Sequence, residues 1–316
     1  MGLDLTASYS HPFVGLMTDF SIARDNYNRP LLYPPEGGRR VAYSRPSTLA
    51  KDLDKPTDGL YQYYQTKAMI GMAKSKAIEA RVKALVAKGG NWENAKGDFK
   101  DIITTAEKLG GATEKADRGT ALHDYCESVE TDSLDWDLVP EEYKGPLDAY
   151  YENVVQPGRI KFLAREVFVV VNRPLTLPDG RDITLRVAGS CDRIGELDGE
   201  RMCIELKTGQ DDKYRMAVSA QLALYADGQL YQDAGVRQSI EWAEYWPNAD
   251  DTAEYAATGA SSKEALMLHC SSAPDENGKW RWRIYRVPLA RGRQIVMGGQ
   301  WARKLRTVPM FEEVVL

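Results

Sequence analysis

The sequence predicts an α/β protein in which helices precede a strand-rich centre. Two observations indicate this class. Residues 165–208 contain three consecutive runs rich in strand-forming residues. Stretches with helical periodicity stand before and after these runs, which favours a sheet covered by helices.

The N-terminal half is expected to be helical after an irregular start. A helix is predicted over 49–87, with Ser47 or Thr48 as its N-cap, and Gly89-Gly90 ends it. A second helix, over 94–109, also ends at a glycine pair. Two further helices are expected over 117–130 and 147–154.

The centre of the chain is expected to form three strands. Residues 165–172 are rich in valine, and the runs 185–196 and 201–207 flank Asp198-Gly199, the strongest short signal for a β-hairpin. The later elements are expected to be a helix from Asp211 or Asp212 to about Gln232, strands at 240–246, 265–270 and 280–288, a polar loop at 247–262 and a helix at 290–305.

These elements suggest four parts along the chain. Prolines and glycines punctuate the first part, which is why it is expected to be irregular. The parts are an N-terminal arm (1–45), a helical region (46–117), an α/β core (118–246) and a C-terminal strand–helix extension packed on the core (247–316).

Composition is that of an ordinary soluble protein. Of 316 residues, 43% are hydrophobic and 28% are charged, and the net charge of −5 creates no global basic field. No apolar run is long enough to cross a membrane, so we expect no membrane partner and a cytoplasmic location. The four cysteines form no CxxC pair, which indicates reduced thiols. No phosphate-binding loop of the GxxxxGK[ST] type is present, so ATP is not expected as a cofactor.

The hairpin makes the most specific chemical prediction. With Asp198 and Gly199 at the turn, Asp192 lies opposite Glu205, and Lys207 shares their face of the sheet. Facing carboxylates repel, and a divalent cation between them removes that repulsion. The alternative is a solvated face on which Glu205 and Lys207 form a surface ion pair worth less than about 1 kcal/mol.

Two helices carry polar pairs at a spacing of one turn. His123 and Glu127 share one helical face, as do Gln221 and Tyr225. Gly119, one turn before His123, permits close approach of another backbone. The structural alternatives are a satisfied helical histidine and a tyrosine that packs on the sheet.

Basic residues mark one side of the first long helical region. They make its exposed face either an ordinary solvated surface or a track for a phosphate backbone, and the sequence favours neither. These residues are Lys67, Lys74, Lys76, Arg81, Lys83 and Lys88.

In order, the chain contains a helix with GTxxHxxxE, a strand, a strand with GxxD, a strand with ExK and a helix with QxxxY. This order, over about residues 118–245, resembles the RecB-like exonuclease family of the PD-(D/E)XK nuclease superfamily. The resemblance implies a restriction-endonuclease-like core, in which helices flank a central mixed sheet.

The resemblance also implies roles for individual residues. The implied metal ligands are His123, Asp192, Glu205 and the carbonyl of Leu206. The implied catalytic residues are Asp192, Glu205, Lys207, Gln221 and Tyr225. Supporting or substrate-side roles fall to Glu127, Glu166, Gln221 and Tyr225.

The function expected from this resemblance is a DNA exonuclease that uses one or two Mg²⁺ or Mn²⁺ ions to hydrolyse phosphodiester bonds in recombination, repair or replication. Linear DNA ends, single-stranded or tailed, are the expected substrate, and a recombination or replication protein is an expected partner. The alternatives are a structure-specific or single-strand endonuclease, a non-catalytic DNA-binding protein with a nuclease fold, and a generic α/β binding protein.

The chain departs from the family pattern at its cysteines. Many relatives hold an iron–sulfur cluster on one upstream cysteine and a C-terminal trio, but here only Cys270 lies beyond Cys203. We therefore expect no cluster, and a stand-alone phage-type nuclease in the bacterial host cytoplasm is the nearer analogy. Cys191 also replaces the nominal proline before the aspartate.

Overall fold

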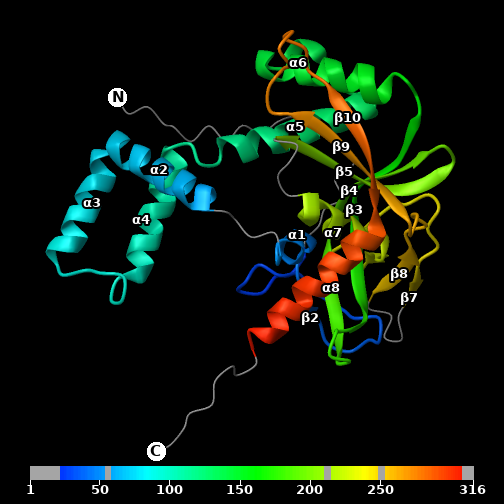
Figure 1. The fold of residues 1–316 in the computed structure, drawn as a ribbon, viewed down its shortest axis with the longest axis horizontal. Helices are drawn as coiled ribbons and strands as arrows, with labels where there is room; N and C mark the ends of the chain where they lie inside the picture. Colours follow the sequence, from blue (N-terminus) through cyan, green and yellow to red (C-terminus); the bar gives the residue numbers. More distant parts are fainter. Residues whose placement is uncertain (1–21, 54–57, 210–214, 248–252, 308–316) are drawn as a thin grey trace, which may run out of the picture.

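The structure, a computed structural model, describes residues 22–53, 58–209, 215–247 and 253–307. It is an α/β protein with an eight-stranded mixed sheet in the order β10-β9-β5-β4-β3-β6-β8-β7 (Figure 1). Only β5 and β9 run parallel; the other neighbouring pairs are antiparallel. The strands are β3 (Ile160–Thr176), β4 (Asp182–Leu197), β5 (Glu200–Gly209), β6 (Gln229–Gln232), β7 (Trp246–Pro247), β8 (Glu254–Ala257), β9 (Glu264–Ser271) and β10 (Trp282–Pro288).

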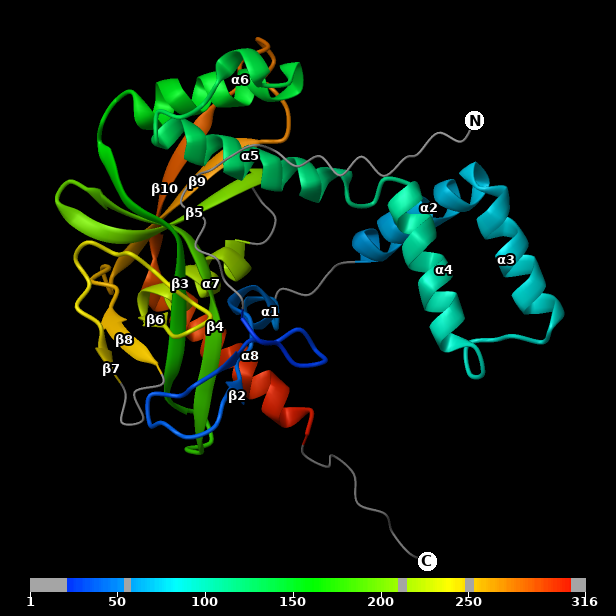
Figure 2. The same ribbon diagram turned by 180° about the vertical axis from the view of Figure 1, so that it is seen from behind.

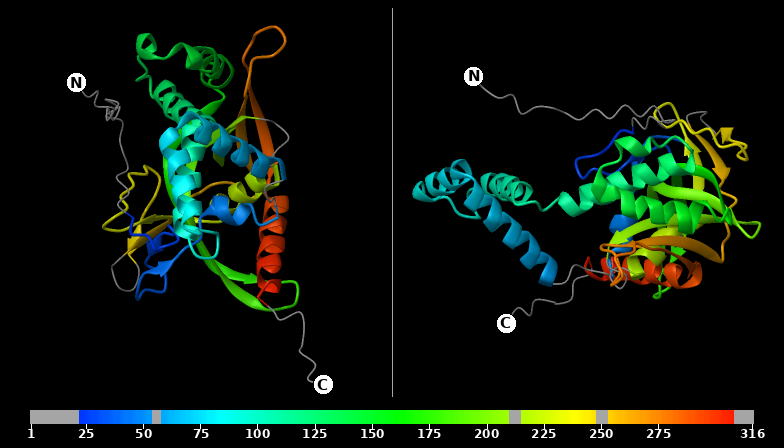
Figure 3. Two further views of the ribbon diagram at one scale, coloured as in Figure 1. Left: turned by 90° about the vertical axis from the view of Figure 1, so that its left-hand side faces the viewer. Right: turned by 90° about the horizontal axis from the view of Figure 1, so that it is seen from above.

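Helices cover both faces of this sheet (Figures 1 and 3). On one face, Leu122 and Leu147 bury apolar side chains against Ile204 and Leu206 of β5. On the other, α7 packs on β5, β3 and β4, and α8 packs against α7. The helices of these two layers are α5 (Glu114–Glu130), α6 (Glu141–Tyr150) with a π turn at Tyr151–Val155, α7 (Arg215–Ala226) and α8 (Leu289–Leu305).

The predicted hairpin is confirmed. Leu197 pairs with Glu200, which leaves Asp198 and Gly199 as the two turn residues. Both have positive φ, 55° and 80°, as a two-residue type I′ turn requires. The turn thus fixes the register of β4 against β5.

The N-terminal region is less irregular than predicted. Within residues 22–45, β1 (Leu31–Leu32) and β2 (Val41–Ala42) form a two-stranded sheet. Leu32 and Tyr43 are buried against β3 and β6. Each of these strands has only two residues, too short a run to signal a strand in the sequence.

The long helix predicted over 49–87 is three helices: α1 (Pro46–Ala50), α2 (Asp58–Lys74) and α3 (Lys76–Ala87). Pro46 occupies the first turn of α1 and Arg45 is its N-cap, so neither Ser47 nor Thr48 caps it. The Ser75 hydroxyl accepts a hydrogen bond from the Ile78 amide and so starts α3.

Helices α2, α3 and α4 (Lys96–Leu109) form a separate three-helix unit beside the sheet, which we call the helical module (Figures 1 and 2). Its small core contains Ala68, Ile78, Ile102 and Ala106. Glycines let α2 and α4 touch: a Cβ on Gly71 would lie 1.8 Å from the Ala106 carbonyl oxygen.

Gly71→Ala is expected to destabilise the helical module by about 1–3 kcal/mol, because the helices must separate to admit the methyl group. Hydrogen exchange should accelerate in α2 and α4 but not in the sheet. Gly97→Ala is the control, since a Cβ there meets nothing within 4 Å and alanine favours the helix. Equal protection of α2 in wild type and Gly71→Ala would refute the prediction.

Four further predictions, three of them in the second half of the chain, differ from the structure. Residues 240–246 were expected to form a strand, but among them only Trp246 belongs to one, β7. Trp242 instead packs against the core and donates its indole N–H to the Thr258 carbonyl. The helix expected to reach Gln232 ends at Ala226, and β6 follows. The expected loop at 247–262 contains β8, and the helix expected at 147–154 begins at Glu141.

The C-terminal strands also differ from the expected extension. β9 pairs with β5 inside the main sheet, so β9 and β10 are part of the sheet rather than packed upon it. The helix caps proposed at Asp211 or Asp212 lie outside the described residues. Within the described ranges, no helix is both long and apolar enough to span a bilayer.

Candidate functional site

The hairpin brings two carboxylates together on β4 and β5. Arg193 pairs with Ile204, in the predicted register, and this is the last pair of β4 with β5. Asp192 and Glu205 adjoin that pair, and the charge of Asp192 acts on the Glu205 carboxyl. The Leu206 backbone N–H donates a 2.7 Å hydrogen bond to Asp192 Oδ2. Leu206 thus contacts Asp192 through its amide, and a ligand role for its carbonyl stays a prediction.

A third carboxylate comes from β3. Arg165 pairs with Arg193, which places Glu166 beside Asp192. Glu166 has a φ of 46°, a strained conformation for a residue with a side chain and one that clusters at functional sites. Burial, and then the charge of Asp192, raise the pKa of Glu166 to about 7. The Glu166 side chain is 48% exposed, so water screens part of the repulsion between Glu166 and Asp192.

Glu205 is the most deeply placed of the three. Its Oε1 accepts hydrogen bonds from Lys207 Nζ at 2.5 Å and from Gln221 Nε2 at 2.9 Å. Its Oε2 is buried and has no hydrogen-bond partner among the described residues. Burial, with Asp192 second, raises the pKa of this carboxyl to about 7. A buried carboxylate oxygen without a hydrogen-bond partner lowers the free energy of unfolding, and a bound ligand would offset that cost.

Helix α7 supplies the amide and the phenol that the QxxxY spacing predicts. Gln221 and Tyr225 lie one turn apart, and Gln221 Nε2 donates to the Tyr225 hydroxyl at 3.2 Å as well as to Glu205. Tyr225 also packs in the core between α7 and the sheet. Tyr225 thus packs on the sheet, as the structural alternative expects, and its hydroxyl bonds to the amide that also contacts Glu205. A catalytic role for the pair stays a prediction.

Helix α5 brings His123 to the same place. Its Nδ1 lies 3.7 Å from Asp192 Oδ2. Burial lowers the pKa of His123, which favours the neutral imidazole that binds metals. A Cβ on Gly119 would lie 3.1 Å from Thr208 Oγ1, so this glycine allows α5 to approach the end of β5 as expected.

The sequence analysis missed a buried ion pair beneath the site. The side chain of Arg193 is 1% exposed, and its Nε donates to both oxygens of Glu130, which is 0% exposed, at 2.9 Å. The guanidinium also donates to the Asp192 carbonyl at 2.8 Å and to the His123 carbonyl at 3.4 Å. Glu127 approaches it to 3.9 Å.

A signal for this pair exists in the sequence. Glu130 follows His123 by seven residues and therefore lies on the same helical face. A charged residue next to Asp192 within a buried strand needs a countercharge, and this face of α5 provides it. Arg193 thus connects the backbones of two residues predicted to bind metal.

The donor set suits a hard divalent cation. Carboxylate oxygens from three strands, a neutral imidazole and the orphaned Glu205 oxygen are ligands that Mg²⁺ and Mn²⁺ accept. Among the described residues, no three His, Cys, Asp or Glu side chains are close enough together to form a ready-made metal cluster.

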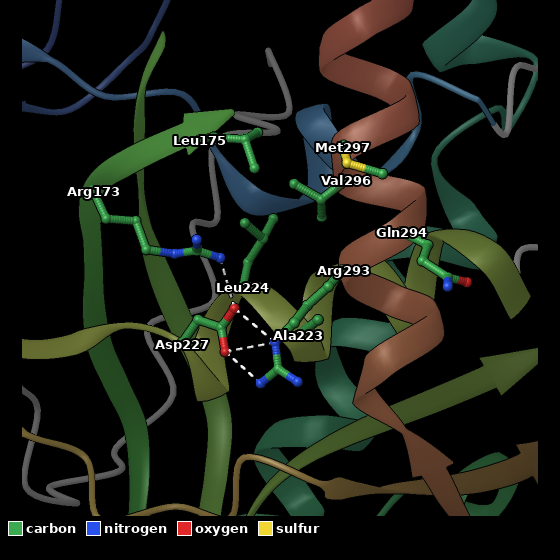
Figure 4. A pocket seen from close by; sticks show the side chains of 9 residues that line it. All are labelled: Arg173, Leu175, Ala223, Leu224, Asp227, Arg293, Gln294, Val296 and Met297. Atoms are coloured by element: carbon green, nitrogen blue, oxygen red, sulfur yellow. Dashed lines mark hydrogen bonds and ion pairs between the residues drawn. The ribbon is translucent and has the colours of Figure 1, made fainter. Parts of the chain in front are cut away.

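The pocket in Figure 4 is a different feature. It is a cavity of about 240 Å³ with largely apolar walls from β3, α7 and α8. Asp227 lines this cavity and accepts hydrogen bonds from Arg173 at 2.8 Å and from Arg293 Nε at 3.0 Å (Figure 4). Ala223 and Leu224 line this pocket, whereas Gln221 bonds to Glu205, so α7 contributes to both features.

Comparisons with known proteins add little. No family model and no curated protein matches this chain. Among solved structures, the crystal structure of SSO0001 is 18% identical and aligns over 69% of this chain and 71% of its own, with a TM-score of 0.31. A likeness of this size supports no conclusion, so the site rests on its own geometry.

Proposed function

We propose that this protein is a cation-dependent nuclease with a restriction-endonuclease-like core that hydrolyses phosphodiester bonds in DNA. One observation carries the proposal. Glu166, Asp192 and Glu205 stand on three adjacent strands beside Lys207, and one buried oxygen of Glu205 has no hydrogen-bond partner within the described part of the chain. Repelling carboxylates are retained in a sheet where a cation offsets their repulsion.

The residues fall into distinct roles. Asp192, Glu205 and His123 would hold Mg²⁺ or Mn²⁺, with Glu166 beside them. A bound cation supplies an acidified water and stabilises charge on the scissile phosphate. Burial lowers the pKa of Lys207, but Glu205 and Asp192 outweigh burial and hold this pKa above its usual value.

A protonated Lys207 can donate hydrogen bonds to the attacking water or to a phosphate oxygen, where they act in a partly buried site. Gln221 donates to Glu205 and so fixes the orientation of that carboxylate. The Tyr225 hydroxyl accepts from the same amide and keeps it from rotating away.

The test is cleavage of end-labelled linear single-stranded and double-stranded DNA and of closed circles, without ATP, in Mg²⁺, Mn²⁺ or EDTA. We expect loss of linear DNA in either metal and none in EDTA. Lys207→Ala should lower the rate by about 10²–10³-fold, the effect of removing one charge-stabilising donor. The control is Lys144→Ala, which removes a surface lysine paired with Glu141.

The outcomes separate the alternatives. Loss of linear DNA alone supports an exonuclease, and the label gives its polarity. Cleavage of circles supports an endonuclease with the same site. Bound but intact DNA in every metal would mean that the protein is a binding module and not an enzyme.

A further inference from the structure

The cavity in Figure 4 has an apolar side and a charged side. Its volume is about 240 Å³, below the roughly 300–1,000 Å³ of pockets that hold drug-sized ligands. In Figure 4, Leu175 and Val296 stand across this space from Asp227. The cavity therefore suits a small ligand with an apolar part and a polar part. The apolar wall consists of Leu175, Ala223, Leu224, Val296 and Met297.

Positive charge exceeds negative charge on the charged side. Within the part of the chain that the structure describes, the charged residues lining the cavity are Arg173, Asp227 and Arg293. Two guanidinium groups and one carboxylate leave an excess of one positive charge. The side chains of Arg173 and Arg293 are 39% and 33% exposed, whereas that of Asp227 is 14% exposed. A dissolved anion therefore meets the guanidinium groups before it meets the carboxylate.

One hydrogen-bond donor of Arg173 indicates where an anion would bind. Arg173 Nη2 donates to Asp227 Oδ2 at 2.8 Å, but Arg173 Nε is buried and has no hydrogen-bond partner among the described residues. A buried donor without an acceptor lowers the free energy of unfolding. A carboxylate oxygen at Arg173 Nε would offset this cost, because guanidinium N–H groups and carboxylates match in geometry.

The structural alternative is an ion-pair group that only holds three elements together. Asp227, which directly follows α7, would then join Arg173 of β3 to Arg293 of α8. One arginine is enough to neutralise one aspartate, and an ion pair needs no cavity beside it. A ligand accounts for the second arginine, the unpartnered Nε and the adjoining apolar space together.

We infer that this cavity binds a small organic carboxylate. The ligand's carboxylate would accept hydrogen bonds from Arg173, and its apolar group would contact the wall formed by α7 and α8. The excess of one positive charge matches a monoanion, whereas a phosphate dianion would bring surplus negative charge against apolar walls. The lining residues differ from the proposed cation ligands, so this inference does not rest on the proposed function.

The test is calorimetric titration of sodium benzoate into the full chain at constant ionic strength. Benzoate should bind saturably to one site. Benzamide has the same ring without the charge, and acetate has the carboxylate without the ring. Each should bind about 10-fold or more weakly than benzoate, since a hydrogen bond to a charged group, like the burial of an apolar ring, contributes about this factor.

Two variants alter the two sides of the cavity separately. Arg173→Gln should weaken benzoate binding about 10-fold or more, and it leaves the 3.0 Å bond between Arg293 and Asp227 to hold α8. Met297→Trp fills the apolar side, keeps both arginines and should abolish saturable binding. The matched control is Arg291→Gln, which removes an exposed arginine of α8 that is not among the lining residues. This control should bind benzoate as the wild type does.

Asp227→Asn separates a ligand site from the structural alternative. The asparagine raises the excess positive charge of the cavity by one, so benzoate should bind more tightly even though loss of the ion pairs lowers the melting temperature. Equal or weaker binding by Asp227→Asn would assign the arginines to the ion pairs alone and overturn the inference.

Further results would also overturn it. They are absent benzoate binding by the wild type, equal binding by the wild type and Arg173→Gln, and equal affinity for acetate, phosphate and benzoate. The melting temperature of each variant without ligand shows whether it is folded, so a loss of binding is distinguished from a loss of structure. Cleavage of DNA plays no part in this test, and its outcome stands whether or not the protein is a nuclease.

Discussion

Asp192→Asn is expected to abolish cleavage while stabilising the cation-free protein. In the wild type, the Leu206 amide donates a 2.7 Å hydrogen bond to Asp192 Oδ2. The side-chain oxygen of asparagine can accept the same hydrogen bond. The substitution removes the charge that faces Glu205 and Glu166. We expect the cleavage rate to fall on the order of 10³-fold or more. Relief of the repulsion with the buried Glu205 should add about 0.5–1 kcal/mol to the free energy of unfolding.

The sign of the stability effect follows from Glu205. Folding raises the pKa of this carboxyl from 4.5 to about 7, through burial first and Asp192 second. A carboxyl with a raised folded pKa destabilises the folded state at pH values above its unfolded pKa. The gain in Asp192→Asn should therefore be full above about pH 7 and vanish below about pH 4.5.

Thermal unfolding in EDTA and in Mg²⁺ measures this effect. Wild type should gain stability when the cation is added, by mass action, and Asp192→Asn should not. Asp148→Asn, an exposed change on α6, is the control and should leave both melting and cleavage unchanged. A lower melting temperature of Asp192→Asn in EDTA would contradict the view that Asp192 repels its neighbours.

The hairpin shows why the central part of the site was predictable. A two-residue Asp-Gly turn fixes register locally, and period-two alternation then determines which side chains share a face. Asp192 and Glu205 could therefore be placed side by side from sequence alone. One-turn spacing similarly placed Gln221 and Tyr225 on one face of α7. Their chemical roles, as opposed to their positions, stay predictions.

Tertiary contacts decide what the sequence did not predict. Trp242 lies in a segment of strand-like composition, yet its indole bonds to Thr258 and the segment packs as a loop. The break between α2 and α3 depends on Ser75, the N-cap of α3. Serine favours such caps but also occurs inside helices, so its presence alone does not mark a break. The structure places Glu166 beside Asp192, while the supporting role that the resemblance implied for it stays a prediction. Its positive φ has no sequence signature.

Glu130→Ala is expected to cost about 3–5 kcal/mol, the largest effect on stability that the described contacts predict. The change leaves Arg193 buried with its charge uncompensated. It also removes the carboxylate oxygens that accept 2.7 Å hydrogen bonds from the Tyr150 hydroxyl and from Arg165 Nε. Denaturant unfolding measures the loss, and Glu127→Ala is the control. Glu127 is 3.9 Å from Arg193 and partly exposed, so its removal should cost less than about 1 kcal/mol.

A double replacement separates stability from positioning. Glu130→Leu with Arg193→Met should recover much of the lost stability, because apolar residues of similar volume replace buried ion pairs at little cost. It cannot restore the hydrogen bonds that Arg193 donates to the carbonyls of Asp192 and His123. We therefore expect a folded protein with weakened cation-dependent stabilisation and slower cleavage. Full recovery of both would show that Arg193 only offsets the charge of Glu130 and does not position the site.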